Sequence, residues 1–276
     1  MLLRHVALVS ESESVNFKSL MRVSAALQKQ AIKDLGPIWN IKATVDAFES
    51  LDDVPIGYWP IVIRDDIHVR AAGIHEDKDG QPFALVQAGP GWSLTASHEN
   101  LEMLVDPFGR RLASGQSPIE EQGRVEFLVE VCDPSEDAAF GYTVNGVLVS
   151  DFYTPEYFNP VVNPGVRHSF TGAIKRPRQV LRGGYLSWHD PVSDDWFQEI
   201  FFGSEPQFRN IGPLTNKGED NFRTQIYYKT PEAFATRVPQ EESAGLLTAA
   251  RDSVETAASS RAKFLRARIE QVLARR

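Results

Sequence analysis

The sequence contains little cysteine and no long apolar segment. Its 276 residues include a single cysteine, Cys132. One cysteine excludes an internal disulfide and a metal site built from several thiolates. No stretch reaches the roughly 18 consecutive apolar residues that a membrane-spanning helix needs, so we expect no membrane contact. Any metal site in this chain must therefore be built mainly from histidines and carboxylates.

Positive charge is also in short supply. The chain has 29 Lys and Arg residues against 37 Asp and Glu residues, which gives a formal net charge of −8. This balance speaks against a general nucleic-acid binder, which needs a positive surface. The apolar run near Met1 is broken by Arg4 and His5 and is too short for the core of a secretory signal. We therefore expect a cytoplasmic protein.

The first third of the chain shows the pattern of a helix followed by strands. Hydrophobic residues make up 42% and charged residues 24%, which is typical of a folded globular protein. Apolar side chains at helical spacing predict a helix over residues 15–35, ended by Gly36 and Pro37. Runs with strand composition follow at residues 41–48, 59–64 and 83–87.

A second helix is expected directly after the third of these strands. Ser93 or Thr95 can cap a helix over residues 95–105, which Asp106 and Pro107 bring to an end. The order so far is one helix, a small mixed sheet and then another helix.

The second half of the chain differs in composition. Residues 124–131 predict one more strand, and the chain from there to about residue 235 is rich in glycine, proline and aromatic residues, which favours irregular β structure and ordered loops. Residues 241–276 lack proline and are rich in alanine and arginine, which predicts one long helix with a basic end. We therefore expect one domain at 1–235 and a helical tail at 236–276. This tail docks on the body, binds a protein partner or joins copies of the chain in a homo-oligomer.

The segment most informative about function lies on the predicted helix at 95–105. Its His-Glu-x-x-Glu pattern places His98 and Glu102 four residues apart, and so on one face of the helix. An imidazole and a carboxylate at this spacing can hold one metal ion. Glu99 lies beside them, where its carboxylate can take a proton from a water molecule that the metal polarises. The pattern predicts a metal site with Glu99 as general base, and a solvated helix face is its ordinary alternative.

A third ligand must come from elsewhere in the chain. Glu130 and Asp133 are the candidates because the end of the strand at 124–131 can be brought over the helix; a surface turn is the alternative for both. Asp106 fits better as the residue that ends the helix, and Cys132 as a small buried residue. A carboxylate set with one histidine favours a harder ion than zinc, such as calcium or manganese. The expected cofactor is a divalent metal, with zinc as the first candidate and calcium and manganese as alternatives.

The chain resembles zincin-type metallopeptidases in its order of elements and in two short segments. These are Ser-His-Glu-Asn-Leu-Glu-Met-Leu-Val-Asp-Pro at 97–107 and Glu-Val-Cys-Asp at 130–133. They are similar to a zincin-related group of bacterial and phage proteins, and to the pattern of exordium-type (phosphate-induced) proteins. The resemblance implies a zincin-like fold and a peptidase ancestry. It departs from the familiar peptidase pattern at Glu102, where a second histidine would stand.

The resemblance also implies where a peptide substrate lies. In zincin-type peptidases the strand just before the motif helix forms the sheet edge along the cleft, and its backbone groups can pair with an extended peptide. Here that strand is 83–87, with Phe83, Leu85 and Gln87 as the candidate substrate-binding residues.

Other polar residues fit structural roles better. His75 is predicted to lie in a loop, and His168 and His189 lie in aromatic surroundings, although His189 has the chemistry to join the site. Ser97 precedes His98 on the helix, and adjacent helical residues do not face each other, so a serine hydrolase is excluded. Four tyrosines are candidate hydrogen-bond donors to an oxyanion: Tyr142, Tyr153, Tyr157 and Tyr185.

The sequence thus predicts an α+β protein with a zincin-like fold and leaves two functions open. One is a metal-dependent peptidase or hydrolase, with zinc as cofactor and a peptide or protein as substrate. The other is a binding or assembly protein that keeps the same scaffold without catalysis and binds a partner through residues 241–276.

Overall fold

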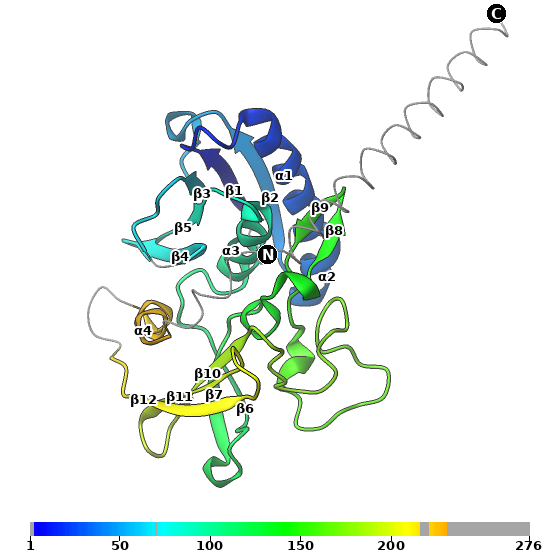
Figure 1. Ribbon diagram of the computed structural model, residues 1–276, viewed down its shortest axis with the longest axis vertical. Helices are drawn as coiled ribbons and strands as arrows, with labels where there is room; N and C mark the ends of the chain where they lie inside the picture. Colours follow the sequence, from blue (N-terminus) through cyan, green and yellow to red (C-terminus); the bar gives the residue numbers. More distant parts are fainter. Residues whose placement is uncertain (1–2, 70, 216–220, 231–276) are drawn as a thin grey trace, which may run out of the picture.

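The computed structural model describes residues 3–69, 71–215 and 221–230. Within these residues the fold is mixed α and β, as the sequence predicts, with two five-stranded sheets and a two-stranded hairpin. In the view of Figure 1 the first sheet lies in the upper part and the second sheet at the bottom, with helix α3 (Trp92–Val105) near the middle. None of the described helices has the length and apolar character required to cross a membrane.

The first sheet has the spatial order β2-β1-β3-β5-β4, and only β4 runs antiparallel to its neighbour. Its strands are β1 Leu3–Ser10, β2 Lys42–Phe48, β3 Tyr58–Arg64, β4 Gly73–Lys78 and β5 Gln81–Gln87. The three predicted strands are confirmed as β2, β3 and β5. Two strands were not predicted, β1 and β4. The apolar run of β1 is what a buried central parallel strand requires.

Strands β4 and β5 form a hairpin, and this places β4 at the sheet edge. Asp79 and Gly80 in the turn have φ angles of 52° and 78°, as a two-residue type I′ turn requires. β5 pairs with β3 on one side and with β4 on the other. The prediction that the strand before the motif helix forms the edge is therefore wrong. The backbone of Phe83, Leu85 and Gln87 is already used inside the sheet and cannot pair with a peptide.

The first helix is longer than the sequence predicts. α1 (Phe17–Gln30) continues through a π-helical turn at Ala31–Leu35 into α2 (Gly36–Trp39). The expected stop at Gly36 and Pro37 is wrong because Pro37 stands in the first turn of α2, where the missing N–H of proline costs little. The helix ends instead at Asn40, which adopts the left-handed conformation.

The second half of the described chain forms an antiparallel sheet in the order β12-β11-β10-β7-β6. Its strands are β6 Leu112–Gln116, β7 Arg124–Leu128, β10 Tyr185–Asp190, β11 Asp195–Ile200 and β12 Gln207–Gly212. A hairpin of β8 (Tyr142–Val144) and β9 (Val147–Val149) packs against α1 and α3. Short 3-10 turns occur at Leu51–Asp53, Glu120–Gln122, Asp133–Ser135, Ala138–Phe140 and Pro155–Phe158. The predicted strand at 124–131 is confirmed in β7.

Helix α4 (Phe222–Lys229) is attached to the rest of the molecule by a small apolar contact. One large hydrophobic core joins the first sheet, α1, α3 and the strands β7 and β10. α4 contributes the buried Ile226 to a separate cluster of three buried residues, with Leu128 and Trp196, and its half-buried Phe222 packs against Trp196 in the same cluster. Figure 1 shows α4 beside the edge strand β4 and above the second sheet. The predicted domain boundary at 235 and the helix at 241–276 lie outside the described residues.

Candidate metal centre

Helix α3 carries the His-Glu-x-x-Glu pattern and is buried on every side. All residues from Ala96 to Val105 are buried, including His98, Glu99 and Glu102. A solvated helix face, the ordinary alternative for this pattern, is therefore excluded. Charged groups so far from water need partners of opposite charge or a bound ion. Partners come from β4, from the segment after β7 and from α4.

His98 faces two carboxylates with a single ring nitrogen. Its Nε2 lies 3.2 Å from Glu102 Oε2 and 3.3 Å from Asp133 Oδ1. Two ligands of a tetrahedral ion are about 3.4 Å apart when each lies about 2.1 Å from the ion. The distance from His98 Nε2 to each carboxylate oxygen is therefore close to that between two ligands of one ion. Without an ion, a single N–H on Nε2 must serve both carboxylates.

The segment after β7 brings Glu130 and Asp133 over α3. The backbone N–H of Cys132 donates to Glu102 Oε1 at 3.1 Å, which orients that carboxylate and leaves Oε2 facing the cluster. Ligand atoms of Glu102, Glu130 and Asp133 lie within 4.8 Å of one another. Both Glu130 and Asp133 are buried, so the alternative of a surface turn is wrong. The structure therefore places all four predicted ligands together: His98, Glu102, Glu130 and Asp133.

His75 joins the cluster from β4, contrary to its prediction as a loop residue. The side chain is fully buried, with Nδ1 3.5 Å from Glu99 Oε2 and 3.7 Å from Glu102 Oε2. Its other ring nitrogen, Nε2, lies 3.1 Å from the backbone oxygen of Asp106. A carbonyl partner on one nitrogen orients an imidazole and directs the other nitrogen toward the carboxylates.

β4 approaches α3 closely because it begins with a glycine. A Cβ atom on Gly73 would lie 2.5 Å from Thr95 Cγ2 and 2.8 Å from Glu99 Oε1. Any side chain here would collide with α3 and move β4 away from it. The absence of a side chain at residue 73 thus allows His75, two residues later, to reach Glu99.

Arg223 on α4 inserts its guanidinium among the carboxylates. Nη1 donates to Glu102 Oε2 at 2.9 Å and also to Glu130 Oε2, and Nη2 donates to Glu99 Oε2 at 3.2 Å. Nη1 also lies 3.1 Å from His75 Nε2. The Arg223 side chain is only 7% exposed. It joins three carboxylates that are far from it in sequence.

The cluster has more negative than positive charge. Four buried carboxylates face one arginine and two histidines, so negative charge remains in excess even with both histidines protonated. Burial raises the pKa of Glu130 well above its usual range; Arg223 opposes this, while Glu102 and Asp133 add to it. Burial would also raise the pKa of Glu102, but His98 and Arg223 hold it well below its usual range. A proton on Glu130 or a bound cation can balance the excess.

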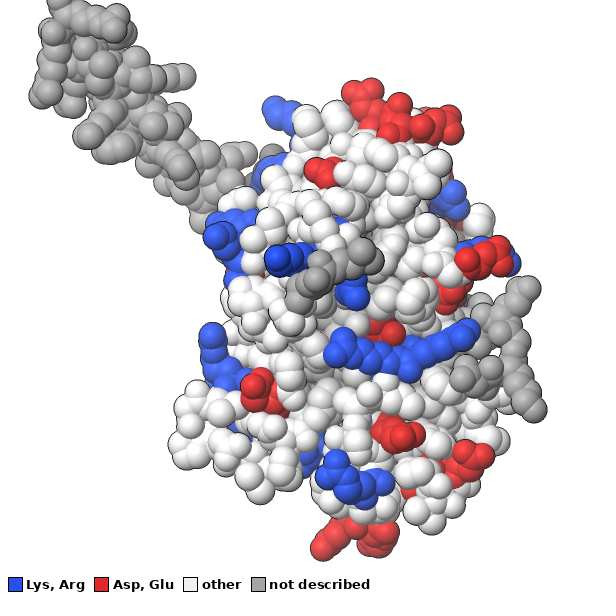
Figure 2. All heavy atoms as spheres, turned by 180° about the vertical axis from the view of Figure 1, so that it is seen from behind, with Lys and Arg blue, Asp and Glu red and all other residues white. Residues whose placement is uncertain are grey.

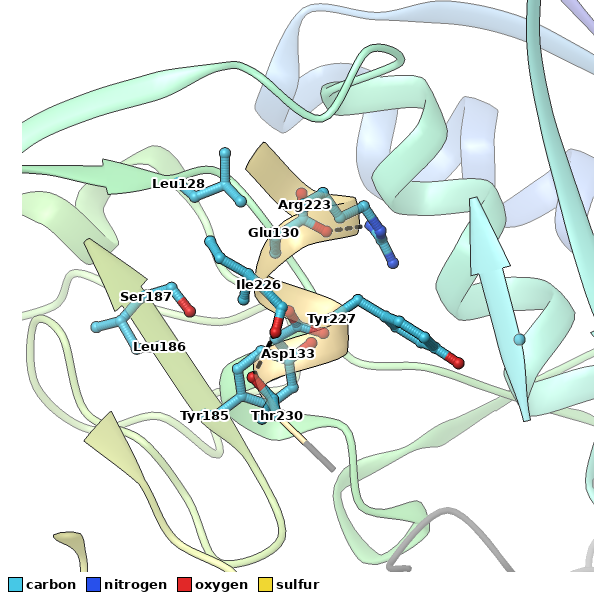
Figure 3. Close-up of a pocket in the computed structure, with 11 residues that line it drawn as sticks. Leu128, Glu130, Asp133, Tyr185, Leu186, Ser187, Arg223, Ile226, Tyr227 and Thr230 are labelled. Atoms are coloured by element: carbon cyan, nitrogen blue, oxygen red, sulfur yellow. Dashed lines mark hydrogen bonds and ion pairs between the residues drawn. The ribbon is translucent and has the colours of Figure 1, made fainter. Parts of the chain in front are cut away.

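A pocket opens beside the cluster, between α4 and the second sheet (Figure 3). Glu130, Asp133 and Arg223 form its polar end, and Figure 3 shows Arg223 and Glu130 joined by an ion pair. The rest of the lining is mostly apolar or aromatic and includes Leu128, Tyr185, Leu186 and Ile226. This lining resembles that of a small-ligand site, but the cavity of about 20 Å³ has room for little more than a water molecule.

Three residues considered from the sequence have structural roles. Asp106 ends α3 and accepts a hydrogen bond from the backbone N–H of Arg111 at 2.8 Å. Ser97 Oγ donates to Gln30 Oε1 at 2.8 Å, which agrees with the exclusion of a serine hydrolase. Cys132 is buried, and burial raises the pKa of its thiol well above the usual range, which disfavours the thiolate that a metal would bind.

The remaining histidines and tyrosines are mostly engaged elsewhere. His168 Nδ1 lies 3.0 Å from the backbone oxygen of Glu156, and His189 contacts Glu126 and Asp194 rather than joining the cluster. Tyr142 donates to Asp34, and Tyr153 and Tyr157 stack at a centroid distance of 4.3 Å. Among the four candidate tyrosines, Tyr185 lines the pocket.

Two members of the cluster were missed by sequence reasoning, for different reasons. His75 was detectable, because Asp79-Gly80 between two short runs is a strong hairpin signal and makes residues 73–78 a strand. Arg223 had no such signal. It lies in an ordinary polar segment more than 90 residues from the nearest of its three carboxylate partners.

The outer surface shows no comparable gathering of one charge in the available view. Figure 2 shows acidic and basic side chains interspersed with uncharged ones over the face opposite to that of Figure 1. The concentration of carboxylates is thus a feature of the interior. Comparison with protein-family models and with curated proteins returns no match to this chain.

Proposed function

We propose that the protein is a metal-dependent peptidase or hydrolase of the zincin-like kind. One observation carries this proposal: in the interior, ligand atoms of Glu102, Glu130 and Asp133 lie within 4.8 Å of one another, and His98 Nε2 lies 3.2 Å from Glu102 and 3.3 Å from Asp133. A buried excess of carboxylates is costly unless a cation compensates it. A bound divalent ion would supply that compensation.

The metal would polarise a substrate carbonyl and make a nearby water molecule more acidic. Glu99 follows His98 directly on α3, and its carboxylate contacts Arg223 and lies within 4.8 Å of ligand atoms of His75 and Glu102. It is the group best placed to take the proton from that water. Tyr185, at the pocket wall, is a candidate donor to a developing oxyanion.

The donor set favours zinc but does not demand it. One imidazole and three carboxylates form a harder set than that of most zinc sites, so manganese and calcium are the alternatives. His75 would add a second imidazole at the edge of the same cluster, and nitrogen ligands favour zinc over calcium. Zinc is therefore the first ion to test.

A peptide substrate would lie along β4 rather than β5. β4 is the last strand of the first sheet, and within the described residues no strand pairs with its outer edge. It passes beside Glu99 at Gly73 and contributes Gly73 to the pocket. An extended peptide can add to such an edge through its backbone groups.

The test is metal binding by the purified chain and by Glu102→Ala. We expect one zinc ion per chain, by elemental analysis and by titration against a chromophoric chelator, and none in Glu102→Ala. Glu126→Ala is the matched control, because Glu126 also lies 3.1 Å from a histidine nitrogen but at the surface. If the unaltered chain binds no zinc, manganese or calcium, the proposed function is wrong.

Catalysis needs a separate measurement. Glu99→Gln preserves the size of the side chain but removes its ability to accept a proton, so it should retain zinc and lose hydrolysis of a peptide library. Hydrolysis that persists in Glu99→Gln would exclude Glu99 as the base.

A second candidate function is a non-catalytic binding or assembly protein on the same scaffold. The observation that favours it is the ion pairing of Arg223, which supplies positive charge to the cluster without a metal. In this case the cluster would join α3, the segment after β7 and α4 as a structural element. The absence of metal together with unfolding on removal of Arg223 would support this function.

A further inference from the structure

The guanidinium of Arg223 forms hydrogen bonds with two of the proposed metal ligands, Glu102 and Glu130. Nη1 donates hydrogen bonds to Glu102 Oε2 and Glu130 Oε2. Glu102 Oε2 is also the oxygen that lies 3.2 Å from His98 Nε2. Nη2 donates a hydrogen bond to the carboxylate of Glu99, the proposed base. One side chain thus engages two proposed ligands and the base at once.

We propose that α4 is a built-in inhibitor of the metal site, in which Arg223 competes with the divalent ion for Glu102 and Glu130. This inference rests on the proposed function, since it assumes that the cluster binds a metal. It states how that site is regulated: the metal enters when α4 moves away, and Arg223 closes the site when α4 returns.

Charge supports competition over coexistence. A cation a few ångströms from a divalent ion is repelled, and each oxygen that donates electron density to the guanidinium donates less to the metal. The site offers four carboxylates, which the guanidinium and the ion would have to share. Once the ion is bound to Glu102 and Glu130, Arg223 loses two of its three carboxylate partners.

Helix α4 is short and has few buried apolar contacts, so it can detach from the rest of the protein more easily than a core helix. An eight-residue helix is not stable in isolation and depends on its packing. Its apolar anchors are the buried Ile226 and the half-buried Phe222, whose ring lies 4.8 Å from that of Trp196, in a small separate cluster, whereas α3 lies in the large core. Elements with few buried apolar contacts open at lower free energy than the core.

Polar contacts hold α4 at both ends without involving the proposed ligands. The backbone N–H of Arg223 donates to the oxygen of Gly109 at 3.3 Å, and Thr224 Oγ1 donates to Glu76 Oε1 at 3.3 Å. At the other end, Lys229 Nζ donates to the oxygen of Ile211 at 2.6 Å. Most of these contacts lie at the surface or in part exposed to water, where a hydrogen bond is readily exchanged for one with water.

The pocket lies directly under α4 and contains the contact that would have to break. Arg223 and Ile226 from the helix face Glu130 and Leu128 from the second-sheet side (Figure 3). Movement of α4 would therefore release the guanidinium and enlarge the pocket together. The same motion opens the route for the ion and the space for a substrate.

The first test is the zinc affinity of the full-length chain with Arg223→Met, which keeps much of the side-chain volume without its charge. We expect zinc to bind at least about tenfold more tightly than to the unaltered chain, because a competing cation is removed. The matched control is Arg124→Met, at an exposed arginine of β7 that donates to Ser114, and it should leave zinc affinity unchanged. Weaker zinc binding by Arg223→Met would overturn the proposal and show that Arg223 supports the metal site.

The second test leaves Arg223 in place and loosens the helix. Ile226→Ala removes the buried apolar anchor of α4 and should speed zinc uptake. In stopped-flow experiments the uptake rate of the unaltered chain should level off at high zinc, because opening of α4 limits it. A rate that stays proportional to zinc concentration and is unaffected by Ile226→Ala would overturn the proposal. This test holds even if Arg223→Met does not fold.

The results of these two tests distinguish inhibition by Arg223 from the proposed metal-dependent function on which it rests. Zinc binding by the unaltered chain with no gain in Arg223→Met or Ile226→Ala refutes inhibition but leaves the metal site intact. Failure of the unaltered chain, Arg223→Met and Ile226→Ala to bind zinc, manganese or calcium refutes both.

Discussion

Two histidines of this protein each lie between two carboxylates, yet they differ in burial. His98 has Glu102 and Asp133 at 3.2 and 3.3 Å, with exposed side-chain fractions of 5%, 0% and 3%. His189 has Glu126 and Asp194 at 3.1 and 3.0 Å, with exposed fractions of 18%, 43% and 92%. The distances alone do not distinguish them.

The two histidines differ in which ring nitrogens contact the carboxylates. His189 meets its carboxylates with two different nitrogens, so a protonated ring can donate one hydrogen bond to each. His98 meets both with Nε2 alone, which has one proton to donate. Water screens the surface group, while the buried group receives further positive charge from Arg223, which donates to Glu102 at 2.9 Å. Burial and the shared nitrogen thus distinguish His98, where we propose a metal site, from His189, which forms a surface ion pair.

The largest effect is expected from removing the positive charge of the buried cluster. With zinc chelated, Arg223→Met should lower the free energy of unfolding by about 3–5 kcal/mol, because it leaves buried carboxylates without their partner. Urea denaturation measures this loss. Arg124→Met, at the surface, should change it by less than about 0.5 kcal/mol. Equal losses in both variants would mean that burial does not set the two regions apart.

The next largest effect is expected on zinc affinity, when each of the two histidines is replaced by alanine. His98→Ala should weaken zinc binding at least about 100-fold, since it removes a proposed ligand, whereas His189→Ala should leave it unchanged. Isothermal titration calorimetry with zinc checks both variants. Similar affinities for His98→Ala and the unaltered chain would show that the buried pair is only an ion pair.

The parts of the fold and of the candidate site that could be predicted from the sequence are those set by residues close together in the chain. The i, i+4 pair on α3 and the nearby Glu130 and Asp133 were predicted, because a helix face and the end of a strand are short-range features. Their burial was not, since the same pattern fits an exposed helix. β1 and β4 were missed because one read as an isolated apolar run and the other as a polar loop.

Arg223 shows where sequence reasoning stops. Its partners Glu99, Glu102 and Glu130 belong to the first half of the chain, and only the packing of α4 between the two sheets brings them together. An arginine in a polar segment has many possible environments, and no spacing rule connects residues so far apart. Buried carboxylates require a compensating cation, but this requirement becomes visible only once the structure shows that they are buried.

A smaller effect is expected for a carboxylate of intermediate burial. Burial raises the pKa of Glu199 on β11 to about 7, with Arg176 opposing the shift. Because this pKa lies above the value of 4.5 for an unperturbed glutamate, the folded state holds the proton more tightly, and stability is lost as the pH rises from about 4.5 to about 7.

Glu199→Gln, which carries no charge at any pH, should remove that loss. At pH 8 the variant should be more stable by about 1 kcal/mol, or about 2–4 °C in Tm, and the advantage should shrink toward pH 4.5. Melting curves between pH 4.5 and 8 give the difference. A constant difference across that range would mean that Glu199 does not titrate in it.

The smallest effect is expected at the surface pair, and it tests whether distance alone has any predictive value. Asp194 lies 3.0 Å from His189 Nε2, closer than Asp133 lies to His98. Its φ angle is 62°, a conformation that asparagine also tolerates, so Asp194→Asn changes the charge with little backbone strain. We expect the free energy of unfolding to fall by less than about 0.5 kcal/mol and this small loss to vanish in 1 M salt, because exposed ion pairs are screened. A loss above about 2 kcal/mol that persists in salt would show that a short distance suffices without burial, and the case for a special site at His98 would lose its main support.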